Sequence, residues 1–414
     1  MPDDLSARSR VIFLNRFYWP EEPATAQLLT DLAEGLAKNG ARVTVITSHS
    51  GRRDLPRLEV HRGVEIKRVR GTRWAASGGM GKAADFLTFY VGAMWKLFFT
   101  AARGDAVISL TDPPLIGVGT WLVARMRGAR VFHWVQDIYP EIAIALTGHA
   151  WLAATRPLRN AAWRHADGCV TLGSDMARPL IDAGVSREKI TIVPNWAPAG
   201  THSDATPITS ALRAEWNLAD RFVVAYSGNL GRVHDLDPVI ELATELRDDP
   251  RISFVFVGGG AQRSRLEALA SARALKHVQF RPAQPRDRLA ETLALGEVHL
   301  VTLLPGCEQL VFPSKLYGVT VAGRPVIFIG PRSSELAQQV EQGRFGRAFD
   351  RSEIGRMADV LRSLSNNAAE VTRLSQAASE FGRPHRGPSR AIASWETLLG
   401  AGARLPVPRE APQS

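Results

Sequence analysis

The sequence is poor in cysteine, and this scarcity excludes several classes of protein. Only Cys169 and Cys307 occur among its 414 residues. Two cysteines are too few for a disulfide framework, and their separation does not fit a zinc site. We therefore expect a protein of a reducing cytoplasm.

An export signal and a long uninterrupted apolar run are also missing. The first ten residues, MPDDLSARSR, are polar and acidic, whereas a signal peptide needs a basic start and an apolar core. The most apolar stretch, residues 86–102, follows Asp85 and contains Lys96. It falls short of the roughly 18 to 20 apolar residues that a membrane-spanning helix requires. We expect neither export nor a spanning helix.

Acidic residues are outnumbered, which leaves a formal net charge of +10. The basic residues that crowd ahead of the apolar stretch are Arg52, Arg53, Arg57, Arg62, Lys67, Arg68, Arg70 and Arg73. Next to an aromatic-rich helix they predict peripheral contact with an anionic inner-membrane surface or a phosphate-bearing lipid. A solvated pair of strands beside an ordinary core helix is the alternative. No nucleic-acid partner is expected, since no recognition fold accompanies the charge.

The chain is apolar enough for large cores, and its length favours two domains. Short apolar runs such as RVIFLN and ARVTVIT alternate with stretches of helical spacing. This alternation predicts an α/β fold with parallel sheets covered on both faces, in two doubly wound halves. The pattern breaks at WAPAGTHSDATPITS and then resumes. The expected parts are domains at residues 1–200 and 201–384, a helix within 385–400 and a disordered tail at 401–414.

Ligands of open parallel sheets bind beyond the carboxyl ends of the strands, so the loops there carry the candidate sites. In YSGNLGRVHDLDP a strand runs into Gly228, Asn229 and Gly231 before a helix, and its backbone N–H groups suit an anion. Arg232 adds a donor. A tight turn without ligand is the alternative, and the Asp-Leu-Asp that follows fits a helix cap better than a metal site.

A glycine run, Gly258 to Gly260, follows another apolar strand. Gly259 and Gly260 allow a ligand to approach the backbone closely, but the run lacks the spacing of a dinucleotide fingerprint. The loop after the first strand, FYWPEEPA, lacks that fingerprint as well. A nicotinamide enzyme is therefore disfavoured.

Two further loops contain the chemically active side chains. Ser314 and Lys315 follow a proline and begin a helix, which is the outline of a diphosphate site; a solvent-facing lysine is the alternative. In HWVQDIYPE, Asp137 and Glu141 follow a strand and could bind sugar hydroxyls or transfer a proton. A helix cap with a surface glutamate would explain the second loop equally well.

Together these loops resemble glycosyltransferase family 4, in particular the bacterial N-acetylfucosaminyltransferase-like and colanic-acid-type branch. The matching stretches are RFYWPEE, SLTDPPLIG, VQDIYPE, KITIVPNW, YSGNLG, FPSKLYGVTVAGRPVIFIG and SSE. The resemblance implies a GT-B fold, with two Rossmann-like domains facing a central cleft and a C-terminal helix that returns to the N-terminal domain. It also implies a retaining, metal-independent reaction from a nucleotide-sugar, with a UDP-sugar of an N-acetylated hexosamine or deoxyhexosamine preferred. The acceptor would be lipid-linked, a lipopolysaccharide or an exopolysaccharide.

The resemblance assigns roles to particular residues. The donor-binding residues would be Gly228, Asn229, Gly231, Arg232, Gly259, Gly260, Ser314 and Lys315. Asp137 and Glu141 would be catalytic, facing the acceptor or the transferred sugar. Tyr18, Trp19 and Glu21, in the first loop, would bind the acceptor.

The chain departs from the family pattern at two places. Leu310 and Gly318 occupy the positions of a Glu-x7-Glu pair whose second member binds the ribose, and we expect Glu335 to take part of that role. The glycine pair of the first loop is replaced by Glu22-Pro23-Ala24. Two alternatives stay open: a nucleotide-sugar 2-epimerase, and a non-catalytic relative that binds nucleotide or lipid.

Overall fold

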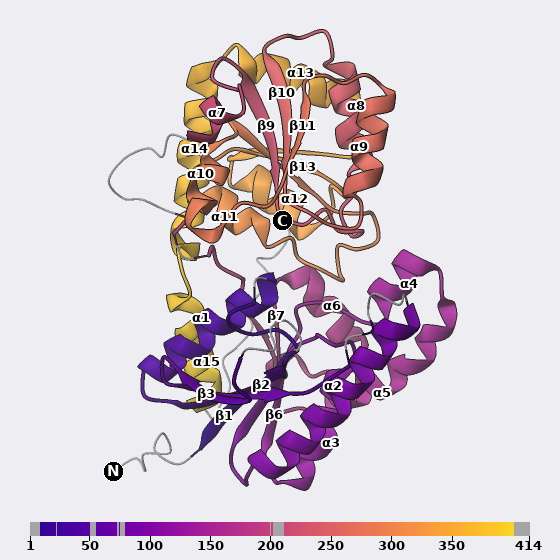
Figure 1. Cartoon of the computed structure of the whole chain (residues 1–414), viewed down its shortest axis with the longest axis vertical. Coiled ribbons are helices and arrows are strands. Elements are labelled where there is room, and N and C mark those ends of the chain that lie inside the picture. Colours follow the sequence, from indigo (N-terminus) through magenta and orange to yellow (C-terminus); the bar gives the residue numbers. More distant parts are fainter. Residues whose placement is uncertain are drawn as a thin grey trace, which may run out of the picture. The chain divides into compact units, whose positions relative to one another are not determined.

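The computed structural model describes residues 9–21, 23–49, 55–72, 74, 79–198, 200–201 and 211–400. The expected tail at 401–414, and Arg52, Arg53 and Arg73 of the basic stretch, lie outside the described residues. The chain forms two compact units, one of residues up to Pro194 together with residues from Pro388 onward, and one of residues Asn195–Gly387 (Figure 1).

The first unit contains an eight-stranded sheet of order β3-β4-β2-β1-β5-β6-β7-β8. All neighbours are parallel except the β3–β4 hairpin. The strands are β1 Arg10–Leu14, β2 Arg42–Ser48, β3 Leu58–His61, β4 Val64–Val69, β5 Ala106–Ser109, β6 Arg130–Trp134, β7 Gly168–Thr171 and β8 Ile190–Ile192. The helices are α1 Ala24–Lys38, α2 Gly79–Thr100, α3 Ile116–Met126, α4 Glu141–Thr147, η3 Ala150–Thr155, α5 Arg156–Arg164, α6 Ser174–Asp182, η4 Arg187–Lys189 and α15 Ser389–Gly400.

The second unit contains a six-stranded, entirely parallel sheet of order β11-β10-β9-β12-β13-β14. Its strands are β9 Phe222–Ser227, β10 Ile252–Val257, β11 Val278–Arg281, β12 Val298–Thr302, β13 Val326–Ile329 and β14 Gly346–Phe349. Its helices are α7 Ala211–Glu215, α8 Asp237–Glu245, α9 Arg263–Ala272, η5 Arg286–Arg288, α10 Leu289–Ala294, α11 Lys315–Val321, α12 Glu335–Gln342, α13 Ile354–Ser365, α14 Ala368–Gly382 and η6 Arg383–His385.

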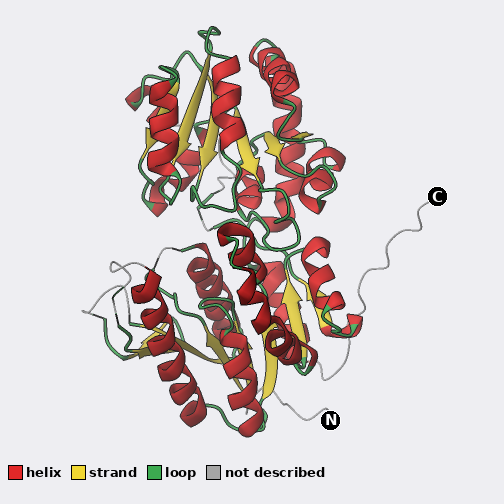
Figure 2. Cartoon of the chain, turned by 90° about the vertical axis from the view of Figure 1, so that its right-hand side faces the viewer, coloured by secondary structure: helices red, strands yellow, loops and turns green. Residues whose placement is uncertain are grey.

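Helices cover both faces of each sheet, as Figure 2 shows for the two units. Strands that are covered on both faces need apolar residues at every position rather than at alternate ones. The central strands meet this requirement: β5 and β10 are buried along their whole length. The apolar runs in the sequence are therefore the cores of these sheets, and the predicted pair of doubly wound units is confirmed.

The last helix, α15, completes the first unit. Trp395 is fully buried and packs edge-on against Phe13 of β1 and Trp134 of β6, with ring centroids 6.3 and 5.5 Å apart. Gly35 of α1 lets the helix come close, because a Cβ there would lie 2.2 Å from Cδ1 of Ile392. The expected return of the C-terminal helix to the N-terminal domain is confirmed.

Within the described residues, no helix is both long and apolar enough to cross a membrane.

Candidate functional site

The second unit brings its two glycine loops together at the carboxyl ends of β9 and β10. The backbone N–H of Gly228 donates to Val257 O at 2.9 Å, and that of Leu230 donates to Gly259 O at 2.7 Å. Gly258 has a φ of +142°, and a Cβ on it would lie 2.1 Å from Gly228 O. A side chain at this position would separate the loops, so glycine is required there.

Lys315, the first residue of α11, extends across β9 to the same loops. Its Nζ lies 3.7 Å from the ring centroid of Tyr226 and donates a hydrogen bond to the Tyr226 hydroxyl. A Cβ on Gly228 would be 3.9 Å from that Nζ. Burial holds the pKa of Lys315 well below its usual range. No carboxylate in the described part of the chain forms an ion pair with this amine, so burial disfavours its charged form and an anion bound beside it would favour that form.

His234, which the sequence analysis did not single out, lies beside this amine. Its Nδ1 donates to Thr302 O at 2.8 Å, and its ring meets that of Tyr226 edge-on. Burial, together with the nearby charge of Lys315, lowers the pKa of His234 to about 3. The ring is therefore neutral at physiological pH. We call Tyr226, Gly228–Gly231, His234, Gly258–Gly260 and Lys315 the second-unit cluster.

The other predicted donor residues surround this cluster in different ways. Ser314 is the N-cap of α11, is partly buried and makes no capping bond with its side chain. Arg232 is exposed, as is Asn229 within the cluster itself. Glu335 begins α12, where its Oε1 accepts from Nε2 of Gln339 at 3.0 Å. The charge of Glu335 adds to burial in raising the pKa of Tyr317, so Glu335 lies close to α11.

Gly318 lies in the middle of α11 with space beside it. A Cβ on this residue would meet only Cδ1 of Leu293, at an ordinary contact distance of 3.6 Å. Packing therefore does not require glycine at this position.

In the first unit, polar side chains gather at the carboxyl ends of β1, β5 and β6, which are neighbours in the sheet. Arg16 follows β1 and pairs with Asp112, which follows β5, with Nε to Oδ1 at 3.1 Å and Nη2 to Oδ2 at 3.2 Å. Asp137 follows β6 and has no hydrogen-bond or ion-pair partner among the described residues. Burial and the charge of Asp112 raise the pKa of Asp137 to about 6. With Tyr139 these residues form the first-unit cluster.

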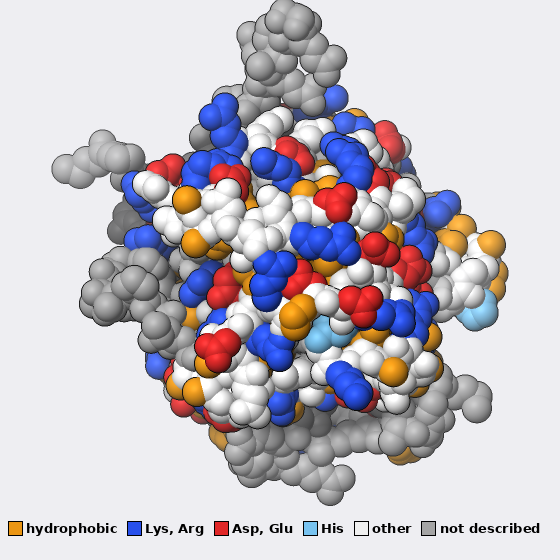
Figure 3. Space-filling view, turned by 90° about the horizontal axis from the view of Figure 1, so that it is seen from above, with side chains coloured by type: hydrophobic (Ala, Val, Ile, Leu, Met, Phe, Trp, Pro, Cys, Tyr) orange, Lys and Arg blue, Asp and Glu red, His pale blue; other side chains and the backbone are white. Residues whose placement is uncertain are grey.

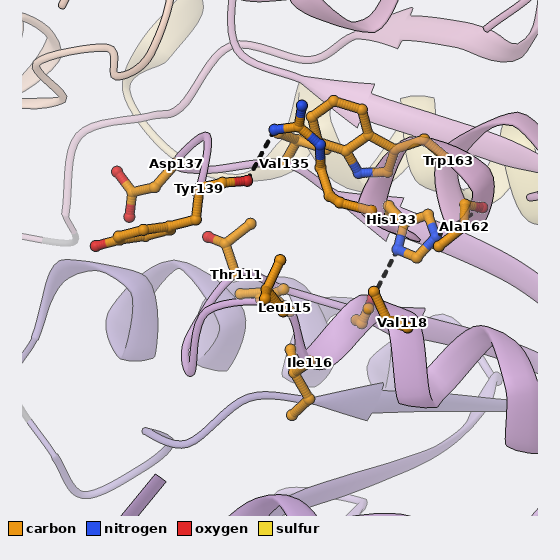
Figure 4. A pocket seen from close by; sticks show the side chains of 14 residues that line it. Thr111, Leu115, Ile116, Val118, His133, Val135, Asp137, Tyr139, Ala162 and Trp163 are labelled. Atoms are coloured by element: carbon orange, nitrogen blue, oxygen red, sulfur yellow. Dashed lines mark hydrogen bonds between the residues drawn. The ribbon is translucent and has the colours of Figure 1, made fainter. Parts of the chain in front are cut away.

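Figure 4 shows how Asp137 and Tyr139 lie in this unit. Their polar ends lie close together, away from the rings of His133 and Trp163. A raised pKa combined with an unpartnered carboxylate is typical of a group that exchanges protons with a ligand. The prediction for Asp137 stays a prediction, but its environment is suited to it.

Glu141 is engaged differently. Both of its oxygens accept from Arg159, at 2.7 and 3.0 Å, and Arg156 approaches at 3.0 Å. Arg159 also donates to Tyr139 O at 2.8 Å. Glu141 therefore connects the start of α4 to α5 and holds the loop that carries Tyr139, and its catalytic role stays a prediction.

A small pocket of about 30 Å³ opens beside Asp137 and Tyr139. Deeper in it, the Ser109 hydroxyl bonds to Nδ1 of His133 at 2.9 Å, while Nε2 approaches Ala162 O at 3.4 Å. Because a carbonyl only accepts, the proton sits on Nε2 and Nδ1 accepts from Ser109. Burial lowers the pKa of His133 to about 4, so this residue is neutral as well.

The three predicted acceptor residues occupy different environments. Tyr18 is 1% exposed, and its hydroxyl has no partner within the described structure. Trp19 stacks on His61 of β3 with ring centroids 3.7 Å apart. Glu21 is partly exposed, and burial raises its pKa. The first loop is thus mostly packed onto the unit, and only Glu21 keeps a reactive group near the surface.

The described part of the basic stretch is largely neutralised by carboxylates. Arg62 pairs with Glu34 at 3.0 Å, and Lys67 lies 3.4 Å from Glu65. Arg68 is buried and pairs with Glu59 at 2.6 Å. These three cations are held by β3, β4 and α1, whereas Arg57 and Arg70 of the same stretch are exposed, so its contact with a membrane stays a prediction.

No three metal-binding side chains come together within the described ranges.

Comparison with known proteins relates both halves of the chain to sugar-transferring enzymes. Residues 25–196 match a family model described as glycosyl transferase 4-like domain, and residues 209–381 match one described as glycosyl transferases group 1. A protein of Escherichia coli (strain K12) named as a colanic acid biosynthesis glycosyl transferase, WcaI, is 29% identical, over 78% of this chain and 84% of its own.

Two solved structures have the same fold. Sucrose-phosphate synthase of Thermosynechococcus elongatus superimposes with a TM-score of 0.76 at 16% identity, covering 95% of this chain and 98% of its own. HepE of Anabaena, solved in complex with UDP, superimposes with a TM-score of 0.71 at 14% identity, covering 94% of this chain and 99% of its own. At these identities the likeness extends to the fold alone.

Proposed function

The chain belongs to the GT-B glycosyltransferases of the surface-polysaccharide type, with a glycosyl transferase 4-like domain followed by a group 1 domain, and from this premise we propose its reaction. It transfers a sugar, with retention of configuration, from a nucleoside diphosphate donor to a lipid-linked or polysaccharide acceptor. UDP is the preferred nucleotide, with an N-acetylated hexosamine or deoxyhexosamine as the sugar. The reaction takes place on the cytoplasmic side of the inner membrane.

The observation that carries this proposal is the buried amine of Lys315. It is held against Tyr226 beside the glycine loops and lacks a carboxylate partner among the described residues. A donor diphosphate would supply the missing negative charge. Backbone N–H groups of the glycine loops and the exposed guanidinium of Arg232 are further donors to its oxygens.

In the proposed reaction, the bond between the anomeric carbon and the diphosphate oxygen breaks, and a bond from that carbon to the acceptor oxygen forms. The diphosphate gains negative charge as it leaves, and fixed cationic donors stabilise that charge most strongly when it is fully developed. Lys315 supplies this positive charge from the protein itself, which supports a metal-independent reaction.

Asp137 receives the acceptor's hydroxyl proton in this proposal. With a pKa of about 6 it is mostly ionised at neutral pH and is a stronger base than an ordinary aspartate. Glu335, near α11, takes part in holding the ribose. The polysaccharide acceptor is supported by the colanic acid relative.

Calorimetric titration of the purified protein with UDP, GDP, dTDP, CMP and NAD tests the donor site. We expect one nucleoside diphosphate to bind, and Lys315→Ala to weaken it about 10- to 100-fold, because a charged hydrogen bond is lost. Lys276→Ala, which removes an exposed lysine of the same unit, is the matched control and should bind as the wild type does. If no nucleotide binds, the transferase proposal fails and a non-catalytic relative is the better interpretation.

A further inference from the structure

A row of large hydrophobic side chains is exposed on α2. Leu87, Val91, Trp95 and Phe99 follow one another at intervals of four, which places them on one face of the helix. Their exposed fractions are 64%, 61%, 70% and 66%. On the opposite face Phe89, Ala93 and Leu97 are buried in the core. The helix is thus apolar on both sides, although the unit covers only one of them.

The neighbouring helix, α3, extends this exposed row. It packs along α2 (Figure 1) at Gly119, where a Cβ would lie 2.4 Å from the Tyr90 hydroxyl and 2.7 Å from Sδ of Met94. Leu122 and Met126 of α3 are 49% and 72% exposed. The six side chains that form what we call the α2–α3 face are Leu87, Val91, Trp95, Phe99, Leu122 and Met126.

An exposed apolar surface spanning two helices is unusual in a protein that has no partner there. On the face of the molecule shown in Figure 3, by contrast, hydrophobic side chains are scattered among lysine, arginine, aspartate and glutamate. Of the eleven exposed large hydrophobic side chains of the described residues, six belong to α2 and α3.

The charges around the α2–α3 face are nearly all positive. Exposed cations lie on the two helices or just beyond them, namely Lys96, Arg103, Arg125 and Arg127. Across residues 83–104 and 116–128 the sequence contains only one carboxylate, Asp85. That carboxylate accepts the backbone N–H of Trp74 at 2.9 Å and lies at the start of α2. Such a surface is complementary to a layer of anions.

Both helices pass close to the first-unit cluster. Phe86, in the first half of α2, lies under the guanidinium of Arg16, with 4.6 Å from Cζ to the ring centroid. At the start of α3, Leu115 and Ile116 line the pocket beside Asp137. The apolar row of α2 therefore starts next to this cluster, at Leu87, and runs along the surface of the same unit.

We propose that the α2–α3 face docks on an anionic phospholipid surface. Trp95 and Phe99 enter the headgroup region of one leaflet, and Lys96 and Arg125 lie against lipid phosphates. The helices lie parallel to the membrane surface and do not cross it. Docking in this orientation brings the first-unit cluster to the headgroup of a lipid-linked acceptor; only this last step rests on the proposed function.

Sedimentation of the full chain with vesicles tests the docking. We expect binding to vesicles of phosphatidylethanolamine and phosphatidylglycerol in equal amounts, weaker binding to phosphatidylcholine alone, and loss of the difference at high salt. Trp95→Asp combined with Phe99→Asp should weaken binding about tenfold or more. Trp151→Asp is the matched control, since it changes a 71% exposed tryptophan of η3, in the same unit but outside the face.

The outcomes separate this proposal from the donor proposal. Calorimetry with UDP on the same samples reports the second-unit cluster, and urea unfolding followed by tryptophan fluorescence shows whether the first unit of each variant is folded. If the wild type binds UDP but does not bind vesicles, the docking proposal is wrong and the donor proposal stands. If it binds vesicles but not UDP, only the donor proposal is contradicted. Equal losses in Trp151→Asp and the double variant would mean non-specific adsorption, which also overturns the docking. If the double variant instead converts a dimer to a monomer and still binds vesicles, the face joins two copies of the chain and the proposal is wrong.

Discussion

Replacing Asp137 by asparagine should stabilise the first unit at neutral pH while removing transfer activity. The carboxyl of Asp137 has its pKa raised from the ordinary 3.8 to about 6, first by burial and then by the charge of Asp112. The folded state therefore holds this proton more tightly than the unfolded chain does. The stabilisation of the folded state that comes from this protonated carboxyl is fully present below pH 3.8. It is lost as the pH rises through about 6, because the buried carboxyl then ionises.

The full pKa difference corresponds to about 3 kcal/mol in the free energy of unfolding at neutral pH. Because the side chain of Asp137 is partly exposed, we expect the measured change to be about 1–2 kcal/mol. Asparagine cannot ionise, so the variant should gain this amount above about pH 6 and nothing at pH 4. Urea unfolding followed by tryptophan fluorescence is a suitable assay, because all tryptophans except Trp196 and Trp216 belong to the first unit. Asp182→Asn, at an exposed carboxylate of α6, is the control. An asparagine variant that is less stable at pH 7, or whose effect does not change with pH, would refute the reasoning.

Four further outcomes are expected. In the wild type, the transfer rate should fall as the pH drops through about 6, because Asp137 becomes protonated and cannot accept the acceptor's proton; a rate that stays level from pH 7 to 5 would contradict this role. Gly258→Ala should weaken nucleotide binding at least about tenfold by pushing the glycine loops apart, whereas Gly355→Ala, in α13 of the same unit and with nothing within 4 Å, should leave calorimetric affinity unchanged. Trp395→Ala should destabilise the first unit by about 3–5 kcal/mol in urea unfolding, since a fully buried aromatic is lost. Gly318→Ala should stabilise the second unit by about 0.5–1 kcal/mol in the same measurement, and a loss of stability would show that its neighbourhood is tighter than the 3.6 Å contact implies.

The second-unit cluster could be predicted from the sequence because its parts follow strands. Gly228, Gly259 and Lys315 each come directly after, or one loop beyond, an apolar run, and the carboxyl ends of parallel strands meet at one edge of a sheet. What could not be predicted was the arrangement of side chains at that edge. His234 lies in the same loop as Gly228, but only its bond to Thr302 O shows that it points inward.

The side-chain contacts of the first-unit cluster were harder to predict from the sequence, because they depend on the order of strands in the sheet. Arg16 and Asp112 are 96 residues apart and become neighbours only because β5 pairs with β1. The sequence marks Glu141 as a candidate for binding sugar hydroxyls or transferring a proton, and only the position of α5 shows that Arg159 pairs with it. In the same way, Arg68 of the basic stretch pairs with Glu59 only because β3 and β4 form a hairpin.

Because Trp395 is buried in the first unit, that unit cannot finish folding until α15 has been synthesised. The central strands of the first unit are made early, but the helix that covers Phe13 and Trp134 is made only after the whole second unit. On the ribosome the second unit can therefore finish folding while the first still exposes an aromatic patch. Exchanging the first unit between related proteins requires cutting the chain at two places, near Pro194 and near Pro388, since a single cut would leave that patch uncovered.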